Sequence, residues 1–267
     1  MKRALMIDGH VHVYQNFQYE TLFAAALDHF SVLSSDGETE SAKVMILLLT
    51  ERSDCSFYSQ ALEINLQDYL FEKTAESGAL LLRQSQTHEP LLYLYAGRQI
   101  ISQEGLEICA LASEYFVADR ALTAEQLVVN INSAGGVAGM NWAPGKWFGS
   151  RGKIVSQLFE RFTPSQLTIS DTTMRPTFWP TPVRMAAAQQ KGFKVICGSD
   201  PLPFAGEELM VAQYGTCILG EFDESMPVTS VRNVLTRPGT TWTVCGRRSG
   251  LASFVKRQSR IMLQKYL

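Results

Sequence analysis

Two histidines near the start of the chain, His10 and His12, stand two positions apart in a run, residues 4–13, that has the pattern of a β-strand. Side chains on a strand alternate between its two faces, so both imidazoles and the Asp8 carboxylate should leave the same face. Neutral imidazole nitrogens are common ligands of zinc, iron and manganese. The spacing therefore predicts half of a metal site at the end of this strand.

The same pattern has a purely structural alternative. A strand at the edge of a sheet can carry two half-exposed histidines that bind nothing. The chain has only four histidines, and the placement of two of them on one strand favours a present or an ancestral metal site. The residues of the strand alone leave both interpretations open.

Length and charge limit the class of protein. A chain of 267 residues, 46% of them hydrophobic, can bury a substantial core, and we expect a single domain over residues 1–267. The formal net charge of −2 gives no overall field toward nucleic acid or an anionic membrane. No apolar run reaches about 18 residues, and the first residues lead directly into a strand, so we predict a cytoplasmic protein without a membrane span.

The five cysteines give no framework for disulfides or a zinc finger. They are odd in number, scattered along the chain and never in the spacing C-x-x-C. We expect them to be reduced and mostly buried.

Strands and helices alternate over most of the chain. Helical spacing of apolar residues covers residues 19–33, and an almost continuous apolar run at 42–49 is typical of a buried parallel strand. Further elements are expected as follows: helices at 57–66, 123–126, 150–162, 181–191 and 207–213, strands at 127–131, 137–142, 167–170, 194–197 and 216–219, and a basic helix from about residue 251. Such alternation predicts a parallel sheet that is either open or closed into a barrel.

The middle of the chain has a different pattern. Four short apolar runs between residues 79 and 112 are separated by turn signals at 89–90, 96–97 and 104–105. This pattern predicts an antiparallel meander inserted into the alternating fold.

Three loops after predicted strands gather polar residues, and sites in α/β folds form at these carboxyl ends. The glycine-rich loop 141–153 places Lys146 and Arg151 before a helix, which suits a phosphate or a carboxylate. The loop 169–176 carries Asp171 and Arg175. Alternatively, the first loop is solvated surface, and Asp171 only caps a turn.

The third loop, residues 195–208, contains Asp200 between a buried strand and two prolines that stiffen its backbone. Asp200 is the stronger site candidate of this loop. Glu207 and Glu208 open the next predicted helix, where acidic residues are favoured for structural reasons. We also interpret the basic residues near the end of the chain as a solvated helix face, namely Arg247, Arg248, Lys256, Arg257, Arg260 and Lys265.

A first strand with Asp8, His10 and His12, together with a late strand that ends in Gly198, Ser199 and Asp200, resembles the metal-dependent hydrolase barrels. These are the amidohydrolase superfamily and the related polymerase-and-histidinol-phosphatase (PHP) type. The resemblance implies that His10, His12 and Asp200 bind a divalent zinc, manganese or iron ion. It also implies that the metal activates water against an amide or phosphoester, and that Asp200 takes the proton from this water.

The sequence departs from these families in its histidines. Further ligands in the families come from middle strands, whereas only His29 and His88 follow His12 here. One interpretation is a carboxylate-rich site of His10, His12, Asp171 and Asp200. The other is a barrel without metal, in which the cations Lys146, Arg151 and Arg175 bind an anion.

We therefore predict a distorted (β/α) barrel of the TIM type, with about seven or eight strands and the insertion near residues 79–112. The predicted function is metal-dependent hydrolysis of a small anionic substrate, with Asp200 as base and Lys146, Arg151 or Arg175 holding the negative group. The alternative is a catalytically silent barrel that binds an anionic ligand or a partner protein. No nucleic acid or membrane partner is expected.

Overall fold

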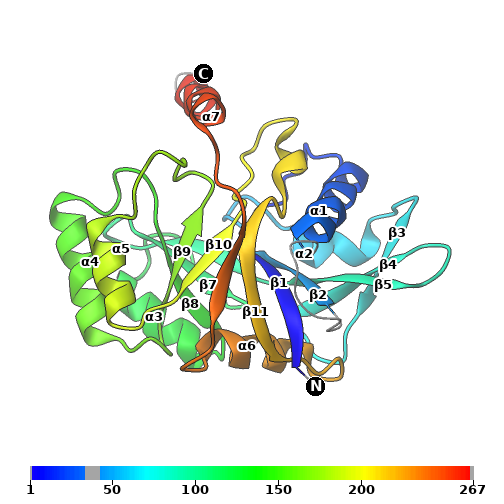
Figure 1. Cartoon of the computed structure of the whole chain (residues 1–267), viewed down its shortest axis with the longest axis horizontal. Coiled ribbons are helices and arrows are strands. Elements are labelled where there is room, and N and C mark those ends of the chain that lie inside the picture. Colours follow the sequence, from blue (N-terminus) through cyan, green and yellow to red (C-terminus); the bar gives the residue numbers. More distant parts are fainter. Residues whose placement is uncertain (1, 34–42, 265–267) are drawn as a thin grey trace.

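The structure, a computed structural model, describes residues 2–33 and 43–264, and within them it has two mixed β-sheets (Figure 1). The first sheet has seven strands in the order β12 (Trp242–Gly246), β11 (Tyr214–Glu221), β1 (Lys2–Val11), β2 (Lys43–Leu49), β5 (Pro90–Tyr95), β4 (Ala79–Gln84) and β3 (Tyr69–Lys73). The second has five strands in the order β10 (Val195–Gly198), β9 (Thr168–Thr172), β8 (Val137–Asn141), β7 (Glu107–Leu111) and β6 (Arg98–Ile101).

The predicted TIM-like barrel is wrong, because neither sheet closes on itself. The central strand β1 pairs in parallel with β2 but antiparallel with β11. A barrel of repeated strand–helix units needs every strand to run in the same direction. The antiparallel pairing of β11 breaks that repeat and ends the sheet at β12.

The predicted insertion at residues 79–112 is not a separate meander. Its first two strands, β4 and β5, belong to the first sheet, where β5 pairs in parallel with β2. Its last two strands, β6 and β7, form an edge of the second sheet. This segment therefore carries the chain from one sheet to the other.

Helices cover the outer face of each sheet (Figure 1). The first sheet packs against α1 (Tyr19–Leu33) and the short α2 (Phe57–Gln60), with Leu22 and Phe23 of α1 in one core with Leu47 of β2. The second sheet packs against α3 (Ala124–Ser133), α4 (Gly149–Arg161) and α5 (Val183–Gln190). The remaining helices are α6 (Pro227–Thr236), α7 (Leu251–Gln264) and the short 3₁₀ turns η1 (Ala61–Glu63) and η2 (Glu207–Met210).

A third apolar core lies between the two sheets. Ile7 of β1 packs there with Leu111 of β7 and Ile196 of β10, and α6 closes the core with Val231. This contact places the end of β10 beside the end of β1, although the two strands belong to different sheets. The late predicted site loop is thereby brought to the first strand.

Several local predictions need correction. Residues 127–131 are helical, because Thr123 and Gln126 form a capping box that starts α3 and carries the helix through to Ser133. The helix predicted at 207–213 is only the single turn η2. The strands β3 and β12 and the helix α6 were not predicted. The helix-ending residues 34–37, and Lys265, lie outside the described residues.

All five cysteines are free thiols, and Cys55, Cys109 and Cys197 are buried, in agreement with the prediction of reduced and mostly buried side chains. Across residues 2–33 and 43–264, none of the helices combines the length and the apolar character needed to span a bilayer.

Candidate metal centre

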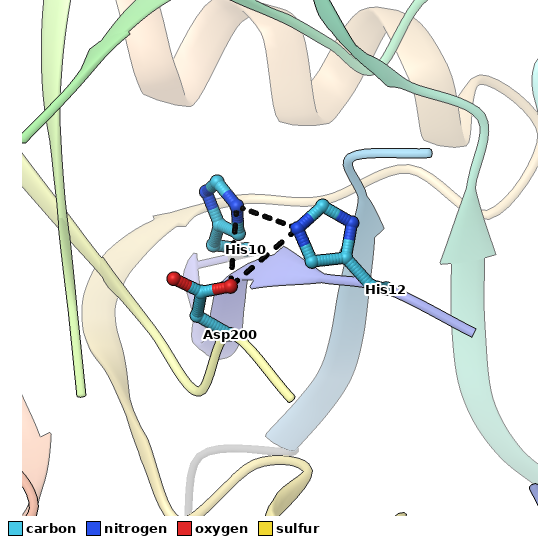
Figure 2. A group of neighbouring side chains, drawn as sticks. All are labelled: His10, His12 and Asp200. Carbon is cyan, nitrogen blue, oxygen red and sulfur yellow. Dashed lines mark hydrogen bonds and ion pairs between the residues drawn. The ribbon is translucent and has the colours of Figure 1, made fainter. Parts of the chain in front are cut away.

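His10, near the end of β1, and His12, just after that strand, lie together in the interior (Figure 2). His10 is fully buried, His12 is 3% exposed, and their Nε2 atoms are 3.2 Å apart. Pairing between β1 and β2 shifts register between Asp8 and Val11. This irregularity interrupts the alternation of β1, so that His10 contacts Ser170 of the second sheet whereas Met6 packs in the outer core.

Asp200 reaches the histidine pair from the end of β10. Its backbone N–H donates to the carbonyl of His10 at 2.9 Å, and its Oδ1 lies 3.4 Å from Nε2 of His12 and 3.8 Å from Nε2 of His10. Figure 2 shows the three side chains pointing toward one another. Gly198 permits this approach, because a Cβ at that position would lie 2.3 Å from the backbone nitrogen of His10.

We expect Gly198→Ala to destabilise the protein by about 3 kcal/mol, because the added methyl group must push β10 away from β1. Urea unfolding of the metal-free protein measures this loss. Gly250→Ala is the matched control, since nothing lies within 4 Å of a Cβ there. Equal stability of the two variants would contradict the close contact between the strands.

The charges of His10 and Asp200 suit a cation. Burial lowers the pKa of the His10 imidazole to about 4, with a further contribution from His12, so His10 is neutral at pH 7. Burial alone would raise the pKa of Asp200, but its interactions with His10, His12 and Arg257 outweigh this effect and hold the pKa well below its ordinary value. A neutral imidazole and an ionised carboxylate are the forms that bind metals.

The distances also fit a small metal ion. Ligand atoms bonded at about 2.0–2.1 Å to a tetrahedral ion lie roughly 3.4 Å from one another. The three donor atoms are separated by 3.2, 3.4 and 3.8 Å and so form one triangular face of such a coordination sphere. Among the described residues, these three side chains are the group of histidine, cysteine or acidic residues with this convergence. A fourth ligand, such as water or substrate, would complete a tetrahedral sphere.

Neighbouring side chains orient two of the three donors. Thr172 donates from Oγ1 to Oδ2 of Asp200 at 2.9 Å, which leaves Oδ1 facing the imidazoles. Ser170 lies 3.2 Å from Nδ1 of His10, so that Nε2 remains directed at the group. Such contacts fix the tautomer and the direction of metal-binding histidines in other proteins. Nδ1 of His12 is buried and finds no hydrogen-bond partner among the described residues.

Asp8 does not join this group. Its carboxylate accepts hydrogen bonds from the backbone N–H groups of His10, Ser199 and Ala212, at 3.2, 2.9 and 2.7 Å. Burial raises the pKa of Asp8 to about 6, although these hydrogen bonds act in the opposite direction. Asp8 therefore joins the end of β1 to two loops and shapes the site without entering it.

Asp171 and Arg175, predicted as a metal ligand and an anion-binding residue, pair with each other instead. Nε and Nη2 of Arg175 donate to the two carboxylate oxygens of Asp171 at 2.7 and 2.5 Å, and the Tyr214 hydroxyl donates to the same carboxylate. Both residues are buried, and the structure does not bring Asp171 into the group of His10, His12 and Asp200. The charges of Asp171 and Arg175 therefore neutralise each other.

Removal of one partner from this pair should lower the stability of the fold. We expect Arg175→Met to destabilise the fold by about 3–5 kcal/mol, because it leaves the Asp171 carboxylate buried without its counter-charge. The affinity for zinc should stay unchanged in the folded variant. The double variant Asp171→Asn, Arg175→Met should regain part of the lost stability. Thermal unfolding and zinc titration separate this result from a ligand role of Asp171, which predicts lost zinc binding.

The two cations of the glycine-rich loop, Lys146 and Arg151, also have partners within the protein. Nζ of Lys146 contacts Oε1 of Glu107 at 2.5 Å, and Asn141 donates to the other oxygen of the same carboxylate at 2.9 Å. Arg151 donates to the carbonyl of Gly145 at 3.0 Å. The negative charge of Glu107 acts to raise the pKa of His10, against the larger effect of burial.

Three nearby residues were not found from the sequence. Glu107 lies in the predicted meander, where nothing marked it as close to β1. Tyr14 follows the histidine motif by two residues, its ring centre is 5.7 Å from that of His12, and it interacts with Arg52. Arg257 was predicted to be solvated but is 2% exposed and contacts the Asp200 loop. The sequence did hold a signal for Tyr14, because it follows His10 and His12 at the same two-residue spacing.

Comparison with known proteins finds a solved structure with a similar fold. No protein-family model matches the sequence, and no curated protein matches it. The structure is similar to that of PsfC from Pseudomonas syringae PB-5123, with a TM-score of 0.60 and 15% identity over 99% of this chain and 100% of that chain. At this identity the likeness shows a shared fold only.

A second, weaker neighbour is a two-domain protein from Bacteroides vulgatus ATCC 8482 that contains a predicted PHP-like metal-dependent phosphoesterase. The TM-score is 0.48, with 12% identity, and the match covers 91% of this chain and 65% of that chain.

Proposed function

We propose that this protein is a metal-dependent hydrolase in which His10, His12 and Asp200 hold one divalent ion. The observation that supports this proposal most strongly is the convergence of Nε2 of His10, Nε2 of His12 and Oδ1 of Asp200 within 3.2–3.8 Å of one another. Two imidazoles and one carboxylate suit zinc, manganese or iron. Three protein ligands with an open position are typical of catalytic rather than structural sites.

A divalent ion bound there would supply an activated water at neutral pH and would polarise the bond that is cleaved. The residues of the chain would hold the ion and orient the side chains that bind it. Thr172 fixes the carboxylate of Asp200, and Ser170 fixes the ring of His10. Asp200 is ionised in the site and would hold the ion through Oδ1, and the same carboxylate serves as the proton acceptor.

A small anionic substrate, a phosphoester or an amide with a negative group, suits the charge of the loaded site. A divalent ion carries more positive charge than the single carboxylate of Asp200 cancels. Lys146 and Arg175 are neutralised by Glu107 and Asp171 and so contribute little to this attraction. Arg52, which is 45% exposed and interacts with Tyr14, is likewise paired with a carboxylate, that of Asp54 at 3.1 Å, so the attraction for an anionic substrate would come mainly from the ion.

Elemental analysis of protein purified without chelator tests the proposal, followed by a panel of phosphoesters and amides assayed before and after chelation. We expect about one equivalent of zinc, manganese or iron, together with a hydrolytic activity that chelation removes and the same metal restores. A protein that contains none of these metals and cleaves no member of the panel would instead be a silent protein that binds an anionic ligand or a partner protein.

A further inference from the structure

The helix α7 reaches the candidate metal centre through a single buried arginine. Arg257 is 2% exposed, whereas its neighbours Val255 and Lys256 are exposed. Its Nη2 donates to the backbone carbonyl of Asp200 at 2.5 Å and lies 2.9 Å from Oε2 of Glu207. Its Nη1 donates to Oγ1 of Thr173 at 2.6 Å. The guanidinium therefore contacts the backbone of a proposed metal ligand.

Asp200 has a backbone conformation that must be held in place. Its φ of 50° lies in the left-handed region, which is unfavourable for a residue other than glycine. Three contacts fix it: its N–H donates to the His10 carbonyl, its carbonyl accepts from Arg257, and its Oδ2 accepts from Thr172. Arg257 supplies the one contact among these that comes from outside the sheets.

The same guanidinium closes the loop that follows Asp200. Oε2 of Glu207 accepts from the backbone N–H of Leu202 at 3.1 Å and pairs with Nη2 of Arg257. Residues 200–207 are thus clamped at both ends by one side chain of α7. Glu207, predicted as an acid that only starts a helix, is 6% exposed and serves as the counter-charge of this clamp.

The other contacts of α7 are fewer and more peripheral. Arg260 stacks on the ring of Phe204 at 4.3 Å, and Phe254 packs edge-on against Phe178. Several apolar side chains of the helix are at least half exposed, namely Leu251, Val255, Met262 and Leu263. Figure 1 shows α7 (red) at the end of the molecule opposite the start of the chain. Docking of the helix therefore depends strongly on Arg257.

We infer that Arg257 is a positioning residue of the metal centre: it holds Asp200 in the conformation that presents Oδ1 to His10 and His12, and it couples the docking of α7 to metal binding. This inference rests on the proposed function. Coupling between two equilibria is reciprocal. Metal should therefore stabilise the docked helix to the same extent as the docked helix strengthens metal binding.

The test compares the zinc affinity of the full-length wild-type protein, Arg257→Ala and Lys256→Ala, measured by competition with a chromophoric chelator. We expect Arg257→Ala to weaken zinc binding about 10- to 100-fold, the range for residues that orient metal ligands. Lys256→Ala, which removes a neighbouring exposed cation from the same helix, should bind zinc as tightly as wild type. Added ethylguanidinium should restore part of the zinc affinity of Arg257→Ala and leave that of Lys256→Ala unchanged. If Arg257 only anchored α7, a guanidinium that is not attached to the helix would restore nothing.

Hydrogen exchange on the wild-type protein gives a second readout that does not depend on a folded variant. Zinc should slow the exchange of amides in α7, while amides of α4, on the outer face of the second sheet, change little. A folded Arg257→Ala protein with a zinc affinity within twofold of wild type would overturn the inference, and so would unchanged exchange in α7. Wild-type protein that binds none of zinc, manganese and iron would overturn the proposed function itself, which distinguishes the two failures.

Discussion

Replacement of His12 with alanine should abolish metal binding and hydrolysis together. The variant keeps one imidazole and one carboxylate, and a site that loses one of three protein ligands should bind zinc more than about 100-fold more weakly. His12 is 3% exposed, and its Nδ1 has no hydrogen-bond partner among the described residues. The polar contacts of its Nε2 are with His10 and Asp200, the two other proposed ligands, so the loss should fall mainly on the metal.

Zinc titration and the thermal stability of the metal-free protein measure the two effects separately. His88→Asn is the control, because His88 is exposed in the turn between β4 and β5, and asparagine tolerates its φ of 57°. The control should bind zinc as the wild type does. If His12→Ala bound zinc normally while losing stability, the histidine would be a core residue and the metal site would lie elsewhere.

Asp200→Asn should reduce turnover about 10²- to 10⁴-fold, the range for loss of a general base, with a much smaller effect on folding. The amide keeps the shape of the carboxylate and can offer its one oxygen to the ion, while its NH2 group takes the place of Oδ2 and faces the Thr172 hydroxyl, which can accept as well as donate. It cannot accept a proton at neutral pH. The variant should therefore retain measurable zinc while kcat falls and KM changes little.

Steady-state kinetics of the zinc-loaded variant, with zinc content measured in the same sample, provide this result. Asp223→Asn is the control, since Asp223 is exposed and, among the described residues, its carboxylate accepts hydrogen bonds only from the nearby Ser225. A zinc-loaded Asp200→Asn protein with wild-type turnover would rule out Asp200 as proton acceptor. Complete loss of zinc would make it chiefly a ligand.

The short-range part of the site could be predicted from the sequence. His10 and His12 were found because the two-residue period of a strand is a local property. The placement of Asp200 at the end of a late strand also follows from a local pattern, namely an apolar run ended by glycine and serine. Their proximity to one another was an inference from fold analogy, and the structure does bring the three side chains together.

The long-range part could not be predicted in the same way. The direction of β11 beside β1 is set by pairing between residues about 200 positions apart, and this pairing replaces the barrel with two open sheets. The partners of charged side chains are also determined by the tertiary structure. Lys146 looked free to bind an anion because its partner Glu107 lies 39 residues earlier in the chain. The burial of Arg257 depends on the Asp200 loop, which no periodicity of α7 reveals.

An anomalous difference map from a crystal grown with zinc tests the central claim most directly. The account predicts one strong peak about 2.0–2.1 Å from Nε2 of His10, Nε2 of His12 and Oδ1 of Asp200, with a further ligand in the open position. The absence of a peak at these atoms, while zinc is bound elsewhere or the three side chains keep their direct contacts, would contradict it.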